Sequence, residues 1–245
     1  MGAYIPQIDK SRSLTALLGV GYRWVQRLFF TSATLSYSNR QSQYLYPSEY
    51  DGILLKTSSV AMPNTQQSLN YDLNLSKGFD WKNLNVSLGG GQSISKLPYF
   101  VQNQFSYLKF LQSCASLEVN IMPASWWLPE YDSDFSSSKS LSQKGRDLLL
   151  WTNKIGCAVE IISNLHLNAG GYHQYNNQGS SPQNTLLLDV SLSYKLKGLH
   201  LSLEWNNICN TKYFYYRDLS SERLFESHYR IRPMSIMLNA RFKIL

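Results

Sequence analysis

The chain contains a series of segments in which apolar and polar residues alternate with a period of two. In the segment nearest the C-terminus, one parity is apolar: Met234, Ile236, Leu238, Ala240, Phe242 and Ile244. The other parity there includes Ser235, Asn239, Arg241 and Lys243. Successive side chains of a strand point to opposite faces, whereas a helix repeats about every 3.6 residues. Each such segment is therefore expected to be a strand with one apolar and one polar face.

The same alternation predicts about eleven strands along the chain. They are expected at residues 13–23, 28–39, 67–79, 84–95, 104–121, 126–133, 146–161, 165–175, 185–196, 199–209 and 229–244. Charge keeps to one parity, and roughly ten tilted residues cross a bilayer. The predicted fold class is therefore all-β, with antiparallel transmembrane β-barrel strands. A soluble β-sandwich that binds a partner would also alternate, and it stays open as an alternative.

The predicted connections alternate between short turns and long polar loops. Short turns are expected near residues 24–27, 80–83, 122–125, 163–164 and 197–198. Long loops are expected over residues 40–67, 97–104, 134–145, 176–184 and 210–227. Outer-membrane barrels have short periplasmic turns and long extracellular loops, whereas a soluble sandwich has no reason to sort its loops by length.

Aromatic residues gather near both ends of the predicted strands. The short-turn side has Trp24, Phe79, Trp81, Trp126 and Trp127. The long-loop side has Tyr37, Tyr44, Tyr46, Tyr172, Tyr175, Tyr213 and Tyr215. Such girdles are typical of the two membrane interfaces. Because the sequence has no apolar run long enough for a transmembrane helix, membrane insertion would require a barrel.

Three irregularities are expected within the strands. The alternation breaks around residues 109–112, which predicts a bulge. Pro129 weakens the strand at 126–133, because proline cannot donate a ladder hydrogen bond. The glycines at 89–91 are interpreted as a site of strand bending. Residues 52–62, where both parities are apolar, are expected to form an ordered extension above the membrane.

The sequence offers little support for an enzyme. Its four histidines, His166, His173, His200 and His228, lack the spacing of a metal site, and its three cysteines, Cys114, Cys157 and Cys209, lack it too. The net charge of +7 comes from scattered lysines and arginines rather than from a nucleic-acid-binding fold. We therefore expect no catalytic residues, no metal, no cofactor and no nucleic acid.

The expected strand number has a consequence for the whole barrel. Bacterial single-chain barrels have an even number of strands, and about eleven is odd. An open sheet would leave two unpaired edges in lipid, where each unsatisfied backbone group costs several kcal/mol. The N-terminus also lacks the pattern of a secretory signal. We therefore expect residues 1–245 to be the C-terminal part of an outer-membrane barrel domain, without a plug domain or a signal peptide.

Two segments resemble a known family. Residues 199–213, LHLSLEWNNICNTKY, resemble the penultimate-strand motif L-x-W-N-N-I/L-x-N-T-K-Y of TonB-dependent outer-membrane receptors, especially those of the Bacteroidota. Residues 229–243 resemble the final strand of these barrels, and residues 46–64 also resemble a segment of these receptors. Such barrels have twenty-two strands, so the resemblance implies that this chain is about half of one. The family usually ends on an aromatic residue, whereas this chain has Ile244 and Leu245.

The resemblance implies a function in nutrient uptake across the outer membrane of a Gram-negative cell. The implied partners are outer-membrane lipid and the missing N-terminal barrel half with its plug, and TonB through the complete receptor alone. The implied ligand contacts lie in the outer loops: Tyr44, Tyr46, Tyr50, Tyr213, Tyr215, Tyr216 and Arg217. This piece alone is not expected to transport. The alternative is a small self-contained outer-membrane barrel that acts as a pore or a hydrolase.

Overall fold

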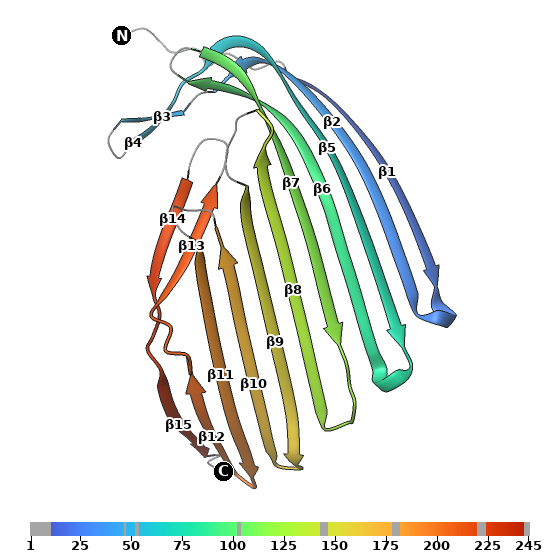
Figure 1. Ribbon diagram of the computed structural model, residues 1–245, viewed down its shortest axis with the longest axis vertical. Helices are drawn as coiled ribbons and strands as arrows, with labels where there is room; N and C mark the ends of the chain where they lie inside the picture. The colour runs from blue at the N-terminus through green and yellow to red at the C-terminus, as the bar shows by residue number, and fades with distance from the viewer. Residues whose placement is uncertain are drawn as a thin grey trace.

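The computed structural model describes residues 11–46, 48–51, 54–101, 104–142, 147–177, 182–219 and 224–242. Eleven strands form one antiparallel sheet, with every strand beside its neighbours in chain order (Figure 1). These strands are β1 Arg12–Trp24, β2 Phe29–Leu45, β5 Val60–Phe79, β6 Leu84–Val101, β7 Gln104–Asn120, β8 Trp127–Ser140, β9 Leu148–Ile162, β10 Leu165–Asn176, β11 Gln183–Leu196, β12 Leu199–Asn206 and β15 Ser235–Phe242.

Two hairpins lie outside this sheet. One joins β3 Ser48–Asp51 to β4 Leu54–Thr57, and the other joins β13 Tyr213–Leu219 to β14 Leu224–Arg230. Both hairpins lie toward the end of the sheet that has the long connections (Figure 1). The opposite end has short turns, two of which contain the 3₁₀ segments Val25–Arg27 and Trp81–Asn83.

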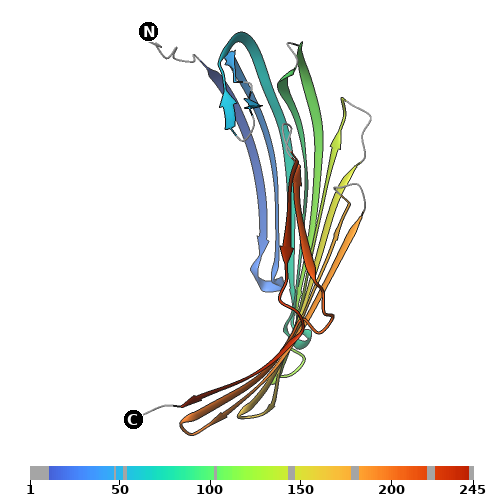
Figure 2. The same cartoon turned by 90° about the vertical axis from the view of Figure 1, so that its left-hand side faces the viewer.

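The sheet is a single curved layer that does not close (Figure 2). Within the described residues, β1 pairs with β2 alone and β15 pairs with β12 alone. The predicted all-β antiparallel fold class and the prediction of about eleven strands are confirmed, and the open edges agree with a partial barrel. The two small hairpin sheets do not form a second layer over the eleven-stranded sheet, which is unlike a β-sandwich. No helix in the described part of the chain is long and apolar enough to cross a membrane.

Several predicted boundaries are wrong at the long-connection end. Strand β2 continues to Leu45, β6 to Val101 and β8 to Ser140, so much of the expected loops 40–67, 97–104 and 134–145 is strand. Residues Val101 and Gln104 are register partners, which leaves a two-residue connection between β6 and β7. Alternation marks a strand only where one face is apolar, whereas backbone pairing continues into polar sequence. The expected extension at 52–62 and loop at 210–227 contain β4 and much of the β13–β14 hairpin.

The predicted bulge at residues 109–112 is wrong, because β7 pairs with β6 and β8 there without a register shift. One shift instead lies between Ser42 and Tyr44 of β2, where β5 has an extra residue next to Pro63. A bulge accommodates a proline because the extra residue leaves the ladder. The Asn64 side chain completes this bulge by donating to the carbonyls of Tyr44 (2.9 Å) and Met62 (3.1 Å).

Pro129 lies near the start of β8, where it removes little of the pairing of this strand. Its register partner on β9 is Cys157, and its carbonyl accepts a hydrogen bond from the Ile121 N–H at 3.3 Å. Both polar groups of a residue in an antiparallel strand point to the same neighbour, so the missing N–H would point toward β7. The β7–β8 ladder ends at Asn120 and Glu130, so the proline lies just beyond it and removes little pairing.

The register places the apolar residues of neighbouring strands opposite each other, so that they share one side of the sheet. Residues directly opposite each other in an antiparallel pair share a face. Leu18, Leu35 and Tyr71 form one row across β1, β2 and β5, and Trp205 and Ile236 belong to another row that ends at β15. We call this side, which also contains Leu73 and Leu203, the apolar face, and the other side the polar face.

The apolar face is exposed along its length. Leu18 is 62% exposed near one edge and Leu238 is 73% exposed at the other. Leu108 is the single buried hydrophobic side chain among the described residues, so this layer has no conventional core. Trp24, Trp81 and Trp126 are exposed at the short-turn end, as predicted. Monomeric soluble proteins rarely expose a continuous apolar surface of this kind.

Candidate functional site

The polar face is hollowed along the middle of the sheet. One hollow of about 810 Å³ extends from β1 to β9, and another of about 640 Å³ extends from β8 to β12. Most of their lining residues belong to the polar face, and Asp132 and Lys154 line both. The polar face is therefore the concave side of the curved sheet, as the lumen of a barrel would be.

All acidic residues of the eleven sheet strands lie on the polar face. They are Asp72, Glu118, Glu130, Asp132, Asp134, Glu160, Asp189 and Glu204. Strand β8 contributes three of them at every second position, and Lys154 of β9 lies directly opposite Asp132. The alternation of acids against the apolar parity could have revealed this surface in the sequence, but the predicted ligand contacts were placed in loops instead.

Glycines allow two of these carboxylates to lie flat against the sheet. A Cβ atom on Gly156 would come within 2.3 Å of the Glu130 Oε1. A Cβ atom on Gly91 would come within 2.4 Å of the Asp72 Oδ1 and within 2.6 Å of the Tyr71 carbonyl oxygen. Residues 89–91 were expected to permit bending, and the structure adds close approach of a neighbouring side chain as a reason for glycine at position 91.

Cross-strand hydrogen bonds connect several other polar side chains of this face. The Asn70 amide donates to the Ser36 hydroxyl at 3.0 Å, and the Asn239 amide donates to the Glu204 carboxylate at 3.2 Å. The Ser76 and Ser87 hydroxyls are 3.1 Å apart. The polar face is thus rich in charged and hydrogen-bonded side chains, which suits a channel wall or a ligand path. The described residues contain no cluster of histidine, cysteine and carboxylate side chains that could hold a metal ion.

The WNN motif forms the turn at which the chain leaves the sheet after β12. Asn207 is 5% exposed and has a left-handed backbone conformation with φ of 51°. Its amide group donates to the carbonyls of Thr211 (2.8 Å) and Arg232 (2.9 Å), and its Oδ1 accepts from the Thr211 N–H (2.9 Å). The Asn207 N–H donates to the Asp189 carboxylate at 2.7 Å. Through its side chain and its backbone N–H together, this one residue joins the outgoing segment, the returning segment and the sheet.

The turn directs the β13–β14 hairpin toward the polar face. The Phe214 ring lies 6.1 Å from the Tyr172 ring of β10, and Tyr172 belongs to the polar face. Phe214 also lines an apolar hollow of about 450 Å³ together with Leu187, Tyr229 and Ile231. The hairpin therefore contacts the polar face near its long-connection end, where a ligand would enter a barrel.

The predicted loop contacts lie on two separate hairpin regions. Tyr44 lies in β2 and is half-buried, and Tyr46 follows that strand and is exposed. Tyr213 begins β13 and is also exposed. The side chains of the other four predicted contacts lie outside the described part of the structure: Tyr50, Tyr215, Tyr216 and Arg217. Their role as ligand contacts stays a prediction.

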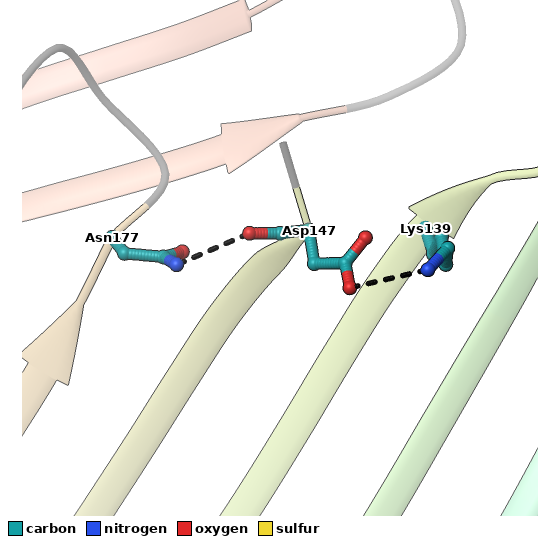
Figure 3. Close-up of polar contacts among 3 residues, drawn as sticks. All are labelled: Lys139, Asp147 and Asn177. Carbon is teal, nitrogen blue, oxygen red and sulfur yellow. Dashed lines mark hydrogen bonds and ion pairs between the residues drawn. The ribbon is translucent and has the colours of Figure 1, made fainter. Parts of the chain in front are cut away.

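A polar cluster lies at the long-connection ends of β8, β9 and β10 (Figure 3). Lys139 and Asp147 form an ion pair at 3.4 Å, with both side chains about half exposed. The Asn177 side chain donates to the Asp147 carbonyl at 3.1 Å and accepts from the Leu149 N–H at 2.6 Å. The exposed ion pair contributes little, whereas the amide satisfies backbone groups where the ladder ends.

Comparison with known proteins finds no matching family model and no matching curated protein. Two solved structures are similar. The siderophore receptor PirA from Acinetobacter baumannii aligns with 95% of this chain and 50% of its own, at 8% identity and a TM-score of 0.45. OmpT, an outer membrane protein of Vibrio cholerae, aligns with 96% of this chain and 95% of its own, at 11% identity and a TM-score of 0.40. This chain spans about half the length of PirA. Both TM-scores are low, so neither likeness assigns a function to this chain.

Proposed function

We propose that this chain forms part of the wall of an outer-membrane β-barrel, and that the complete barrel is a TonB-dependent receptor for nutrient uptake in a Gram-negative cell. The observation that carries the proposal is the division of one eleven-stranded layer into an exposed apolar face and a hollowed polar face. In a barrel, the apolar face contacts hydrocarbon and the polar face lines the lumen. The WNN motif supports the receptor family.

The strand directions support a requirement for further strands. Strands β1 and β15 both run from the long-connection end to the short-turn end (Figure 1). Joining them directly would create a parallel pair, whereas bacterial barrels are antiparallel throughout. An antiparallel closure needs an odd number of additional strands between these two edges. The N-terminal half of a receptor barrel would supply them, together with the plug that this family uses.

The edges give the energetic reason for closure. Strand β1 has 13 residues and β15 has 8, and about half of their backbone groups point away from the sheet. Each unsatisfied group in hydrocarbon costs several kcal/mol, which in sum exceeds the net stability of a domain. Strands paired to both edges would remove this cost. TonB would act on the complete receptor, not on this chain alone.

A cysteine cross-linking experiment tests this arrangement against a small self-contained barrel. The variant carries Val20→Cys in β1 and Leu238→Cys in β15, with the native cysteines at 114, 157 and 209 replaced by serine. We expect no disulfide between the two edges in the complete barrel inserted in its membrane, because the strands of the other half lie between them. A control pair at the register partners Val20 and Ala33 should cross-link. Efficient cross-linking of the two edges would show a self-closed barrel and contradict the proposal.

A further inference from the structure

Several lysines lie on the apolar face near its two ends, and the proposed transport function gives no reason for them there. Acids of the sheet strands are confined to the polar face, whereas lysines occur on the apolar face near its ends. At the long-connection end, Lys96 of β6 lies directly opposite Lys109 of β7. Lys139 of β8 lies opposite Leu111, which makes it the diagonal neighbour of Lys109. We call Lys96, Lys109 and Lys139 the basic patch.

The two central lysines are unusually close for like charges. The Lys109 carbonyl accepts from the Leu141 N–H (2.7 Å), and the Lys109 N–H donates to the Ser142 hydroxyl (2.8 Å), so both groups point toward β8. Lys96 and Lys109 therefore form a non-hydrogen-bonded pair, the type that brings opposite side chains closest. Like charges at this spacing destabilise a sheet unless an anion lies between them.

The surroundings compensate the charge of the basic patch only in part. The Lys96 ammonium lies over the Tyr107 ring, 4.2 Å from its centroid, and the side chain is partly exposed. The exposed Lys109 ammonium has no recorded partner in the described part of the chain. Asp147 pairs with Lys139 at 3.4 Å, at the outer side of the patch (Figure 3). Lys96 and Lys109 therefore lie on the face opposite the carboxylates of the sheet strands, and no described carboxylate pairs with either of them.

The position of the patch identifies the class of anion. The register places Ile94 and Leu111 directly below Lys96 and Lys109, at the upper end of the apolar rows. From Leu84 to Ile94 the strand rises about 33 Å, which spans the hydrocarbon when tilted. The lysines would therefore lie at the level of lipid headgroups on the extracellular side. Two ammonium groups about 5 Å apart at their stems suit a phosphate oxyanion.

We propose that the basic patch binds the phosphate of an anionic lipid of the outer leaflet. This inference rests on the proposed function, because it requires the apolar face to contact a bilayer. The lipid phosphate would neutralise the facing lysines, and its acyl chains would lie against the apolar rows below. The site is thus a lipid site on the outer wall, separate from the hollows of the polar face.

The test compares lipid binding by the complete barrel that contains this chain, in vesicles of phosphatidylcholine with and without phosphatidic acid. Flotation first establishes insertion, and native mass spectrometry after detergent extraction then counts bound phosphatidic acid. We expect the Lys96→Gln/Lys109→Gln variant to bind phosphatidic acid at least about tenfold more weakly, since each lysine near an anionic surface contributes roughly fivefold. Lys197→Gln, in a turn at the opposite end, should bind as the wild type does, and inorganic phosphate should not compete.

A second measurement does not depend on extraction. Lys109→Gln should raise the melting temperature in phosphatidylcholine, because it removes the like-charge contact, and should lower it relative to wild type when phosphatidic acid is present. Unchanged binding in the double variant, the same sign of the temperature shift in both lipids, or full competition by inorganic phosphate would overturn the lipid site. Failure of the complete wild-type barrel to float would instead overturn the outer-membrane proposal, and the lipid site with it.

Discussion

At the scale of single residues, the clearest requirement is the absence of a side chain at Gly91. A Cβ atom there would lie 2.6 Å from the Tyr71 carbonyl oxygen, which belongs to the backbone of a paired strand and cannot move freely. We expect Gly91→Ala to lower the free energy of unfolding by about 1–3 kcal/mol, as overpacking does. Urea titration of the full chain in detergent micelles measures this.

The matched control is Gly170→Ala. Gly170 also lies on the polar face, within β10, but a Cβ atom there would meet nothing within 4 Å. The free energy of unfolding of this variant should stay within about 0.5 kcal/mol of the wild type. Equal losses in the two variants would show that glycine flexibility, rather than close approach, is what position 91 needs.

At the scale of elements, the Asn207 turn decides where β12 ends. We expect Asn207→Ala to lower the free energy of unfolding by about 1–3 kcal/mol, because it removes the donor to the carbonyls of Thr211 and Arg232 and replaces an asparagine, which tolerates left-handed backbone, with an alanine, which tolerates it less. Asn164→Ala, in the exposed β9–β10 turn, should have little effect. A loss in Asn164→Ala as large as that in Asn207→Ala, by the same titration, would contradict this role.

The elements themselves were predictable to the extent that they have an apolar face. Strand existence and order followed from alternation, because a period of two survives wherever lipid-facing and wet positions alternate. The ends of β2, β6 and β8 could not be predicted in this way, because the outer parts of these strands pair although neither parity is apolar. The bulge beside Pro63 was missed because its signal, a proline and a following asparagine, lies where the strand was not expected.

At the scale of the whole molecule, the sequence predicted an open layer but not its inner surface. The odd strand number implied unpaired edges, and the described sheet has them. The confinement of acids to one parity is visible within single strands, but which acids of different strands lie in one row depends on register, which single-strand patterns do not fix. Lys96 and Lys109 could not be paired from single strands either, because only the register shows that they lie opposite each other.

The central claim is that the apolar face contacts hydrocarbon, and fluorescence quenching along one strand tests it most directly. Single cysteines would replace residues 69 to 75 of β5 in turn, in a background without native cysteines, and each would carry an environment-sensitive dye in vesicles. We predict that a lipid-soluble quencher acts on positions 69, 71, 73 and 75, whereas an aqueous quencher acts on positions 70, 72 and 74. Equal aqueous quenching at both parities would contradict the claim.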